Sequence, residues 1–349
     1  MKKIITALLI LGLCFVTLFS FVACNEKETT SDVTEITICV PDGGPALGMA
    51  YLMKNYPEID GVKVTYKILD GANGIKAAVS SGEADVALMP TNMAAILYNG
   101  GLDIKLVGTN SQGLLYLLSD EVSSADFSLD ALKGKVLNTV GKGGTPEAVL
   151  KKILDSDEIP YEESDTAIEG KVALKFHDEG TTIIGGLTQG KIHYAVLGEP
   201  AVSTALQKVG GSLAIVMDLQ VKWGEATGTE ASYPQTALVA KGSLLSSAAK
   251  LVEKIAKLTA DGSKALIADA TPYINCLKDL GATVPQTFGA AGVARTNIAP
   301  QFGSKAKATV EGYFTILKAF KAPLIGGDLP NSDFYYFSNE LENYTPQVG

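Results

Sequence analysis

The chain has 349 residues, of which 46% are hydrophobic, and its formal net charge is −9. This acidic balance, without a basic patch interleaved with aromatic residues, excludes nucleic-acid binding from the expected functions. A chain of this length suggests about two domains with sizeable cores. Because it has two histidines and no CxxC pair, we expect no metal site, and nothing in the sequence implies a cofactor.

Residues 1–23 predict a leader and not part of the fold. Lys2 and Lys3 precede an apolar run from Ile4 to Ala23, which is typical of a secretory signal. The run could also span a bilayer as an uncleaved anchor, but the polar residues 24–33 favour a tether after cleavage. Phe21-Val22-Ala23-Cys24 resembles the lipobox of bacterial lipoproteins. That resemblance implies a lipid on Cys24 and an extracytoplasmic, membrane-anchored protein.

The two cysteines beyond the leader and the lipobox predict free thiols. Cys39 lies in an apolar strand-like run and Cys276 in an expected helix, and we expect both to be buried. A disulfide between them stays open as an alternative outside the cytoplasm.

Short apolar runs alternate with helical segments along residues 34–112. We expect strands at Ile36–Val40, Val62–Leu69, Asp85–Met89 and Ile104–Gly108, and helices at Ala46–Met53, Ile75–Ser81 and Met93–Leu97. The extended run Gly113–Leu118 is expected to cross into a second lobe.

The second lobe repeats the same alternation. We expect strands at Val136–Val140, Val172–Phe176, Ile192–Leu197 and Leu213–Asp218, and helices at Thr145–Leu154, Thr182–Gln189 and Ala201–Lys208. Tyr233–Ala240 is expected to return as a strand, followed by helices at Leu244–Leu258 and Ser263–Leu280 and a mostly helical remainder to Tyr344. The prediction is therefore an α/β fold with two crossings and C-terminal helices. Residues 34–113 and 235–349 would form lobe 1, and residues 114–234 lobe 2.

A glycine-rich turn occurs once in each expected lobe. Val40–Pro45 matches Val140–Thr145 at an offset of 100, and Ser81–Met89 matches Gln189–Leu197 at an offset of 108. In the first pair, a strand leads through glycines into a helix N-terminus, whose free N–H groups favour an anion or a polar ligand group. The repeat indicates two similar lobes facing a shared cleft, although glycine-rich turns recur in many α/β proteins.

Four segments are together typical of one family: Leu129–Val136, Ser81–Ala87, Gly198–Pro200 and Pro234–Ala240. They resemble the type II periplasmic binding proteins, the solute receptors of ABC importers, along nearly all of residues 34–345. Leu129–Val136 resembles the "dLkGKkv" motif of the branch that takes sulfonates, nitrate, taurine or thiamine pyrimidine precursors. The resemblance implies a monomer that binds a small-molecule solute and works with an ABC permease and, through it, ATPase subunits.

The resemblance also places residues in the cleft. By position in the family motifs, the cleft residues are Asp42, Gly43, Gly44, Pro45, Thr91, Asn92, Thr109, Asn110, Ser111, Gly143, Gly144, Thr145 and Glu199. Asp42 and Glu199 could hold an amino group of a ligand, or could instead form a turn and a helix N-terminal acid. Gly143–Thr145 could bind an anionic group or form a plain turn. Trp223, the single tryptophan, could stack on a ligand or pack in the core.

The charged residues narrow the expected ligand. No arginine lies on residues 34–235, which argues against the bidentate carboxylate clamp of an amino-acid receptor. Glu199 opposite Gly143–Thr145 suggests a zwitterion or an amino-bearing heterocycle, such as a taurine-like sulfonate or a pyrimidine precursor. A surface sensor or adhesin on the same fold remains an alternative. An enzyme is a weaker one, because no nucleophile elbow, metal spacing or phosphate loop is present.

Overall fold

The computed structural model describes residues 33–229, 232–283 and 288–347, and the chain from Val33 onward forms one compact unit. The predicted leader, Cys24 and the tether up to Asp32 lie outside the described residues. Within the described ranges, no helix is both long enough and apolar enough to span a bilayer.

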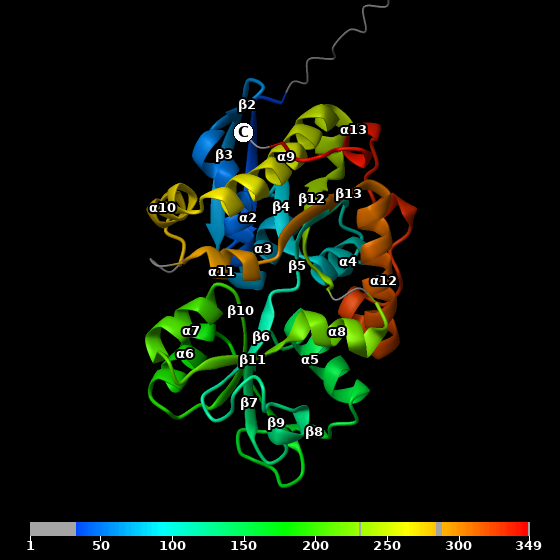
Figure 1. Ribbon diagram of the computed structural model, residues 1–349. Coiled ribbons are helices and arrows are strands. Elements are labelled where there is room, and N and C mark those ends of the chain that lie inside the picture. Colours follow the sequence, from blue (N-terminus) through cyan, green and yellow to red (C-terminus); the bar gives the residue numbers. More distant parts are fainter. Residues whose placement is uncertain (1–32, 230–231, 284–287, 348–349) are drawn as a thin grey trace, which may run out of the picture. The chain divides into compact units, whose positions relative to one another are not determined.

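A seven-stranded sheet in the order β13-β5-β12-β4-β1-β3-β2, with its helices, forms what we call the first lobe (Figure 1). Its strands are β1 (Glu35–Pro41), β2 (Glu58–Ile59), β3 (Val62–Leu69), β4 (Val86–Pro90), β5 (Ile104–Gln112), β12 (Pro234–Lys241) and β13 (Ile298–Phe302). β1 runs parallel to β3 and β4, whereas β12 runs antiparallel to β4 and β5. The carboxyl ends of β1, β4 and β5 therefore lie at one edge of the sheet.

A six-stranded sheet in the order β11-β6-β10-β7-β9-β8 forms the second lobe. Its strands are β6 (Leu115–Ser119), β7 (Val136–Val140), β8 (Tyr161–Glu163), β9 (Val172–His177), β10 (Tyr194–Gly198) and β11 (Ala214–Asp218). β7 runs parallel to β9 and β10, and β6 runs antiparallel to β10 and β11. Since Gly198 at the end of β10 pairs with Leu115 at the start of β6, the carboxyl edge of this sheet adjoins the crossing from β5.

Helices follow most strands of both sheets. They are α2 (Gly44–Asn55), α3 (Gly71–Ser80), α4 (Thr91–Asn99), α5 (Thr145–Ser156), α6 (Gly180–Thr188), α7 (Ala201–Val209), α8 (Leu219–Thr227), α9 (Gly242–Ala268), α10 (Thr271–Asp279), α11 (Ala290–Arg295), α12 (Gly303–Lys321) and α13 (Asn339–Glu342), with 3₁₀ turns η1 (Leu129–Leu132), η2 (Ala322–Ile325) and η3 (Ser332–Phe334). The repeat seen in the sequence is structural, because α2 and α5 each start after a glycine and carry a proline in the first turn.

One cluster of buried apolar side chains extends through both lobes. It includes Met89 of β4, Leu137 of β7 and, between the two sheets, Trp223, Tyr233 and Tyr313. A second cluster lies under α2 and α9, which pack against each other, and a third under α6 and α7. The two lobes therefore share part of their hydrophobic core.

The structure differs from the prediction in several segments, including the short strands β2 and β8, which were not predicted. The expected helical remainder is wrong at β13, a short strand around Pro300 that is held by antiparallel pairing with β5. Helix α8 was not predicted, and the Asp218 carboxylate caps it by accepting the N–H groups of Gln220 and Val221. The two helices expected from Leu244 to Leu280 break elsewhere: α9 continues to Ala268, and α10 starts at Thr271.

The cysteine prediction is confirmed in its main point. Cys39 and Cys276 are free thiols, and Cys39 is buried in β1. Cys276, in α10, is only partly buried, so the expected burial is wrong there.

Candidate functional site

The two carboxyl edges contact each other through the turn between β1 and α2. A Cβ atom built on Gly44 would lie 3.1 Å from Leu114 Cδ2 and 3.4 Å from the Glu199 carbonyl oxygen. Gly43 has a φ of 98°, a conformation that other residues rarely adopt. The predicted residues Gly43, Gly44 and Glu199 therefore meet, and the glycines allow the backbones of both lobes to approach closely.

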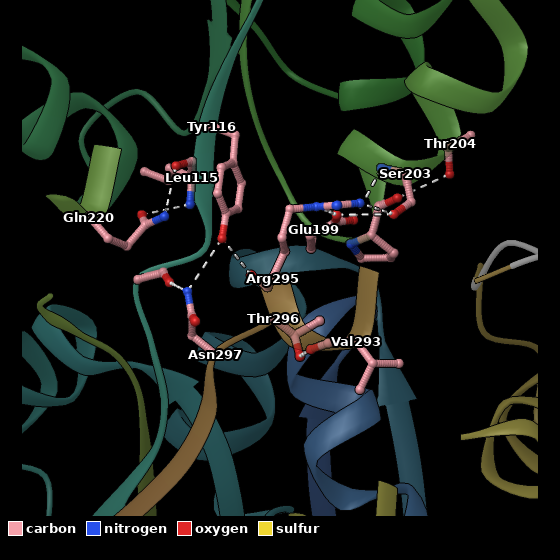
Figure 2. Close-up of polar contacts among 12 residues, drawn as sticks. Leu115, Tyr116, Glu199, Ser203, Thr204, Gln220, Val293, Arg295, Thr296 and Asn297 are labelled. Carbon is pink, nitrogen blue, oxygen red and sulfur yellow. Dashed lines mark hydrogen bonds and ion pairs between the residues drawn. The ribbon is translucent and has the colours of Figure 1, made fainter. Parts of the chain in front are cut away.

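Glu199 is bonded to the single arginine of the chain (Figure 2). Arg295 Nε donates to Glu199 Oε1 at 2.6 Å, and the Glu199 side chain is fully buried. Ser203 donates to the same carboxylate through its backbone N–H at 3.1 Å and its hydroxyl at 3.0 Å. Arg295 Nη2 also donates to Ser203 Oγ at 3.0 Å. The Glu199 charge is thus paired across the two lobes with a residue 96 positions away, which no motif indicated.

The same C-terminal segment binds the crossing strand. The Tyr116 hydroxyl donates to the Arg295 carbonyl oxygen at 3.1 Å, and Asn297 Nδ2 donates to the Gly113 carbonyl oxygen at 2.6 Å (Figure 2). On the other side, Gln220 donates to the Leu115 carbonyl and accepts its N–H, at 3.0 and 2.9 Å. These contacts fix the direction in which β5 continues into β6, and sequence reasoning missed them.

The predicted anion site at the start of α5 already holds a carboxylate. The Gly143 N–H donates to Glu147 Oε2 at 2.5 Å, and Lys151 donates to Glu147 Oε1 at 2.6 Å. Burial would raise the pKa of Glu147, but the bonds from Lys151 and Gly143 outweigh burial and hold this pKa below its usual value. Gly143 is exposed and Gly144 half-buried. The chain's own Glu147 therefore occupies the positive end of this helix.

Thr145 and Asn92 come together from the two lobes. The Thr145 hydroxyl donates to Asn92 Oδ1 at 3.3 Å and accepts a bond from the Tyr313 hydroxyl at 3.1 Å. Asn92 Nδ2 donates to the Leu324 carbonyl oxygen at 3.1 Å. Both side chains are buried, so the contact between the lobes is polar as well as apolar at this point.

Two other predicted groups are bonded locally. The Asp42 carboxylate accepts the N–H of Gly43 at 2.8 Å and both the N–H and the hydroxyl of Thr283. Trp223 is buried, with its ring 5.4 Å from that of Tyr233 and 5.8 Å from that of Tyr313. Asp42 thus ties the β1–α2 turn to the segment after α10, and Trp223 lies in an aromatic cluster.

Several buried polar atoms have no hydrogen-bond partner among the described residues. They are Thr91 Oγ1, Thr109 Oγ1, both amide atoms of Asn110, Gln235 Oε1 and the Tyr335 hydroxyl. Thr91 directly follows β4, Thr109 and Asn110 lie in the second half of β5, and Gln235 is the second residue of β12. Buried polar groups are normally bonded, and each exception needs an explanation such as a water or a ligand. Thr91, Thr109 and Asn110 belong to the set that the family resemblance placed in the cleft.

Comparisons with known proteins agree with this architecture. No protein-family model matches the sequence, and no curated protein does. An ABC transporter protein from Parabacteroides distasonis is 26% identical with a TM-score of 0.74, over 88% of this chain and all of that one. The fold is that of the periplasmic binding proteins.

Two more distant structures share this periplasmic binding protein fold. The ligand-binding component of an ABC-type import system from Staphylococcus aureus, solved with zinc bound, is 11% identical with a TM-score of 0.63, over 90% of this chain and all of that one. The periplasmic aliphatic sulphonate binding protein SsuA from Escherichia coli is 14% identical with a TM-score of 0.61, over 83% of this chain and 93% of that one. Among the residues described here, no group of three His, Cys, Asp or Glu side chains could hold a metal ion.

Proposed function

We propose that the protein is the extracytoplasmic solute receptor of an ABC importer, which captures a small polar solute between its lobes and delivers it to a permease. The fold and the importer components among its structural neighbours support this function. The sulphonate binder among them keeps a sulfonate or zwitterion in view beside an aminopyrimidine-like ligand.

One observation supports the proposal: the unpartnered buried atoms of Thr91, Thr109 and Asn110 lie toward the carboxyl ends of β4 and β5. In open α/β sheets, ligands bind outside the carboxyl ends of the strands. A solute bonded there would satisfy polar groups that are costly to bury alone. It would contact both lobes and favour the conformation in which they lie together.

A thermal-shift screen followed by X-ray scattering tests the function. The screen would compare aminosulfonates, aminopyrimidines, simple anions and amino acids. A ligand at 100 times its Kd should raise the free energy of unfolding by about 2.7 kcal/mol. Scattering should then show a smaller radius of gyration with the ligand than without it. A tight ligand that leaves the radius and the interlobe distance unchanged would contradict capture between the lobes.

We also propose that Cys24 is the lipid acceptor, which anchors the protein to the outer face of the cell membrane. The proposed receptor acts as a monomer. One acyl chain binds a membrane only marginally, so stable anchoring needs more than one chain. Cys24→Ser should release processed protein from the membrane fraction. An unprocessed Cys24→Ser protein that stays in that fraction would support an uncleaved anchor instead.

A further inference from the structure

The charged groups in or next to the expected cleft are all bonded within the chain. Glu199 is paired with Arg295, Glu147 with Lys151, and the Asp42 carboxylate accepts bonds from Thr283. Lys142, the cation of the second-lobe turn, is paired with Glu163 at 2.6 Å. A buried charge needs a partner of opposite sign or several hydrogen bonds. Among these side chains, none is left free to pair with a charged group of a solute.

The groups left without partners are neutral, and Asn110 stands out among them. Both its amide atoms lack a bond within the described chain, and the side chain is fully buried. An amide has one acceptor oxygen and two N–H donors side by side. It can therefore bond at the same time to a donor and to an acceptor that lie side by side on a partner.

The backbone directs Asn110 to this position. Thr236 and Ala237 are consecutive in β12, but they pair with Ser111 and Thr109 of β5, so Asn110 is the extra residue of a β-bulge. Bulges often redirect a side chain next to a binding site. The amide lies against Gly48 of α2, where a Cβ would come within 2.2 Å of Asn110 Oδ1. Strand and helix together thus make room for this amide one turn from the Gly44 end of α2.

We propose that this edge binds an uncharged solute that presents a donor and an acceptor side by side to the Asn110 amide, as lactams, cyclic ureas and pyrimidinones do. Thr91 and Thr109 supply further neutral hydroxyls to the same solute. The proposal rests on the receptor function above and narrows its ligand class to solutes without net charge.

Isothermal titration of the processed protein tests the class with six probes. Uracil, cytosine and ethylene urea are uncharged near neutral pH, whereas taurine, ethanesulfonate and nitrate carry charged groups. We expect at least one uncharged probe to bind ten or more times tighter than every charged one. Asn110→Leu should weaken that probe at least tenfold, because the solute's donor and acceptor lose their partners.

A second readout separates a ligand role from a structural one. Without solute, Asn110→Leu should leave the melting temperature unchanged or raise it, because it removes an unpaired buried amide. If Asn110→Leu lowers the melting temperature and leaves affinity unchanged, the amide is structural and the proposal is overturned. Asn55→Leu, at an exposed asparagine, is the matched control and should change neither quantity.

The remaining outcomes distinguish this proposal from the receptor function. If taurine or ethanesulfonate binds and compacts the protein while the uncharged probes do not bind, the receptor function stands and the uncharged class is wrong. If none of the six probes binds, the proposal of this class is overturned. The receptor function is then decided by the broader screen and the scattering measurement.

Discussion

His177, at the end of β9, provides a pH test at the scale of one residue. Its Nε2 lies 2.9 Å from Asn138 Oδ1, so a neutral ring can donate this bond. Burial, together with the charge of Lys175, lowers the pKa of His177 below its usual value. The unfolded chain therefore binds this proton more readily than the folded one. The resulting stability is present above about pH 6.5 and is lost as the pH falls through the folded pKa.

The expected result is a loss of stability between pH 7.5 and pH 5 that His177→Gln reduces. Urea midpoints of both proteins at several pH values measure it, and comparison with the native protein removes the titration of shared carboxylates. An equal pH slope in both proteins would show that His177 titrates alike in the folded and unfolded states.

Gly48 tests the packing around Asn110. Gly48→Ala should destabilise the fold by about 1–3 kcal/mol, because its Cβ would lie 2.2 Å from Asn110 Oδ1. Gly185 is the matched control: it also lies inside a helix, but nothing is within 4 Å of its Cβ position. Gly185→Ala should stabilise by about 0.5–1 kcal/mol through helix propensity. Denaturant unfolding measures both, and equal signs would contradict this placement of the Asn110 amide.

At the scale of elements, Arg295 bonds α11 to Glu199, in the turn before α7, and to Ser203 of α7. Arg295→Met should cost about 3 kcal/mol of unfolding free energy, because it leaves a fully buried carboxylate without its cation. Replacing Glu199 by Gln in the same protein should recover most of that loss, since the neutral amide can still bond Ser203.

The control for this pair is the exposed ion pair between Lys63 and Glu35. Lys63→Met should leave the urea midpoint essentially unchanged, because solvent screens such pairs. If Arg295→Met is equally harmless, water must solvate Glu199, and the interlobe pair would contribute little.

Local sequence patterns determine most elements but not the partners of their side chains. β7 and β3 match their predicted bounds because each shows a local strand pattern, a short apolar run in β7 and an alternating one in β3. β13 escaped prediction because its five residues include Pro300 and its stability comes from pairing with the distant β5. Pairing between distant residues leaves no periodic signal.

The same limit applies to the candidate site. The glycine turns placed Gly43, Gly44 and Thr145 at the contact between the lobes, because strand, turn and helix start are local features. The partner of Glu199 lies 96 residues away, and that of Asp42 lies 241 residues away. An isolated arginine in a C-terminal helix carries no pattern that would indicate such a partner. The bonding partners of the charged side chains were therefore the least predictable feature of the candidate site.

At the scale of the whole molecule, the aromatic cluster of Trp223, Tyr233 and Tyr313 couples the two lobes. Tyr313 belongs to α12 of the first lobe, and Trp223 belongs to α8, next to the second sheet. The largest buried apolar cluster includes all three rings and continues into both sheets. Because this core is shared, we expect the described unit to unfold in one cooperative transition.

Trp223 is the only tryptophan, so its fluorescence reports this shared core directly. In the native protein, urea should shift the fluorescence and the far-UV circular dichroism at the same midpoint. Tyr313→Ala should cost about 3–5 kcal/mol and separate the two midpoints, because it removes the ring that joins α12 to α8. Tyr313→Phe keeps the ring and loses only the hydroxyl bond to Thr145, so it should keep one midpoint. Separate midpoints in the native protein, or a single one in Tyr313→Ala, would show that the lobes are coupled elsewhere, through the crossing strands or the Arg295–Glu199 pair.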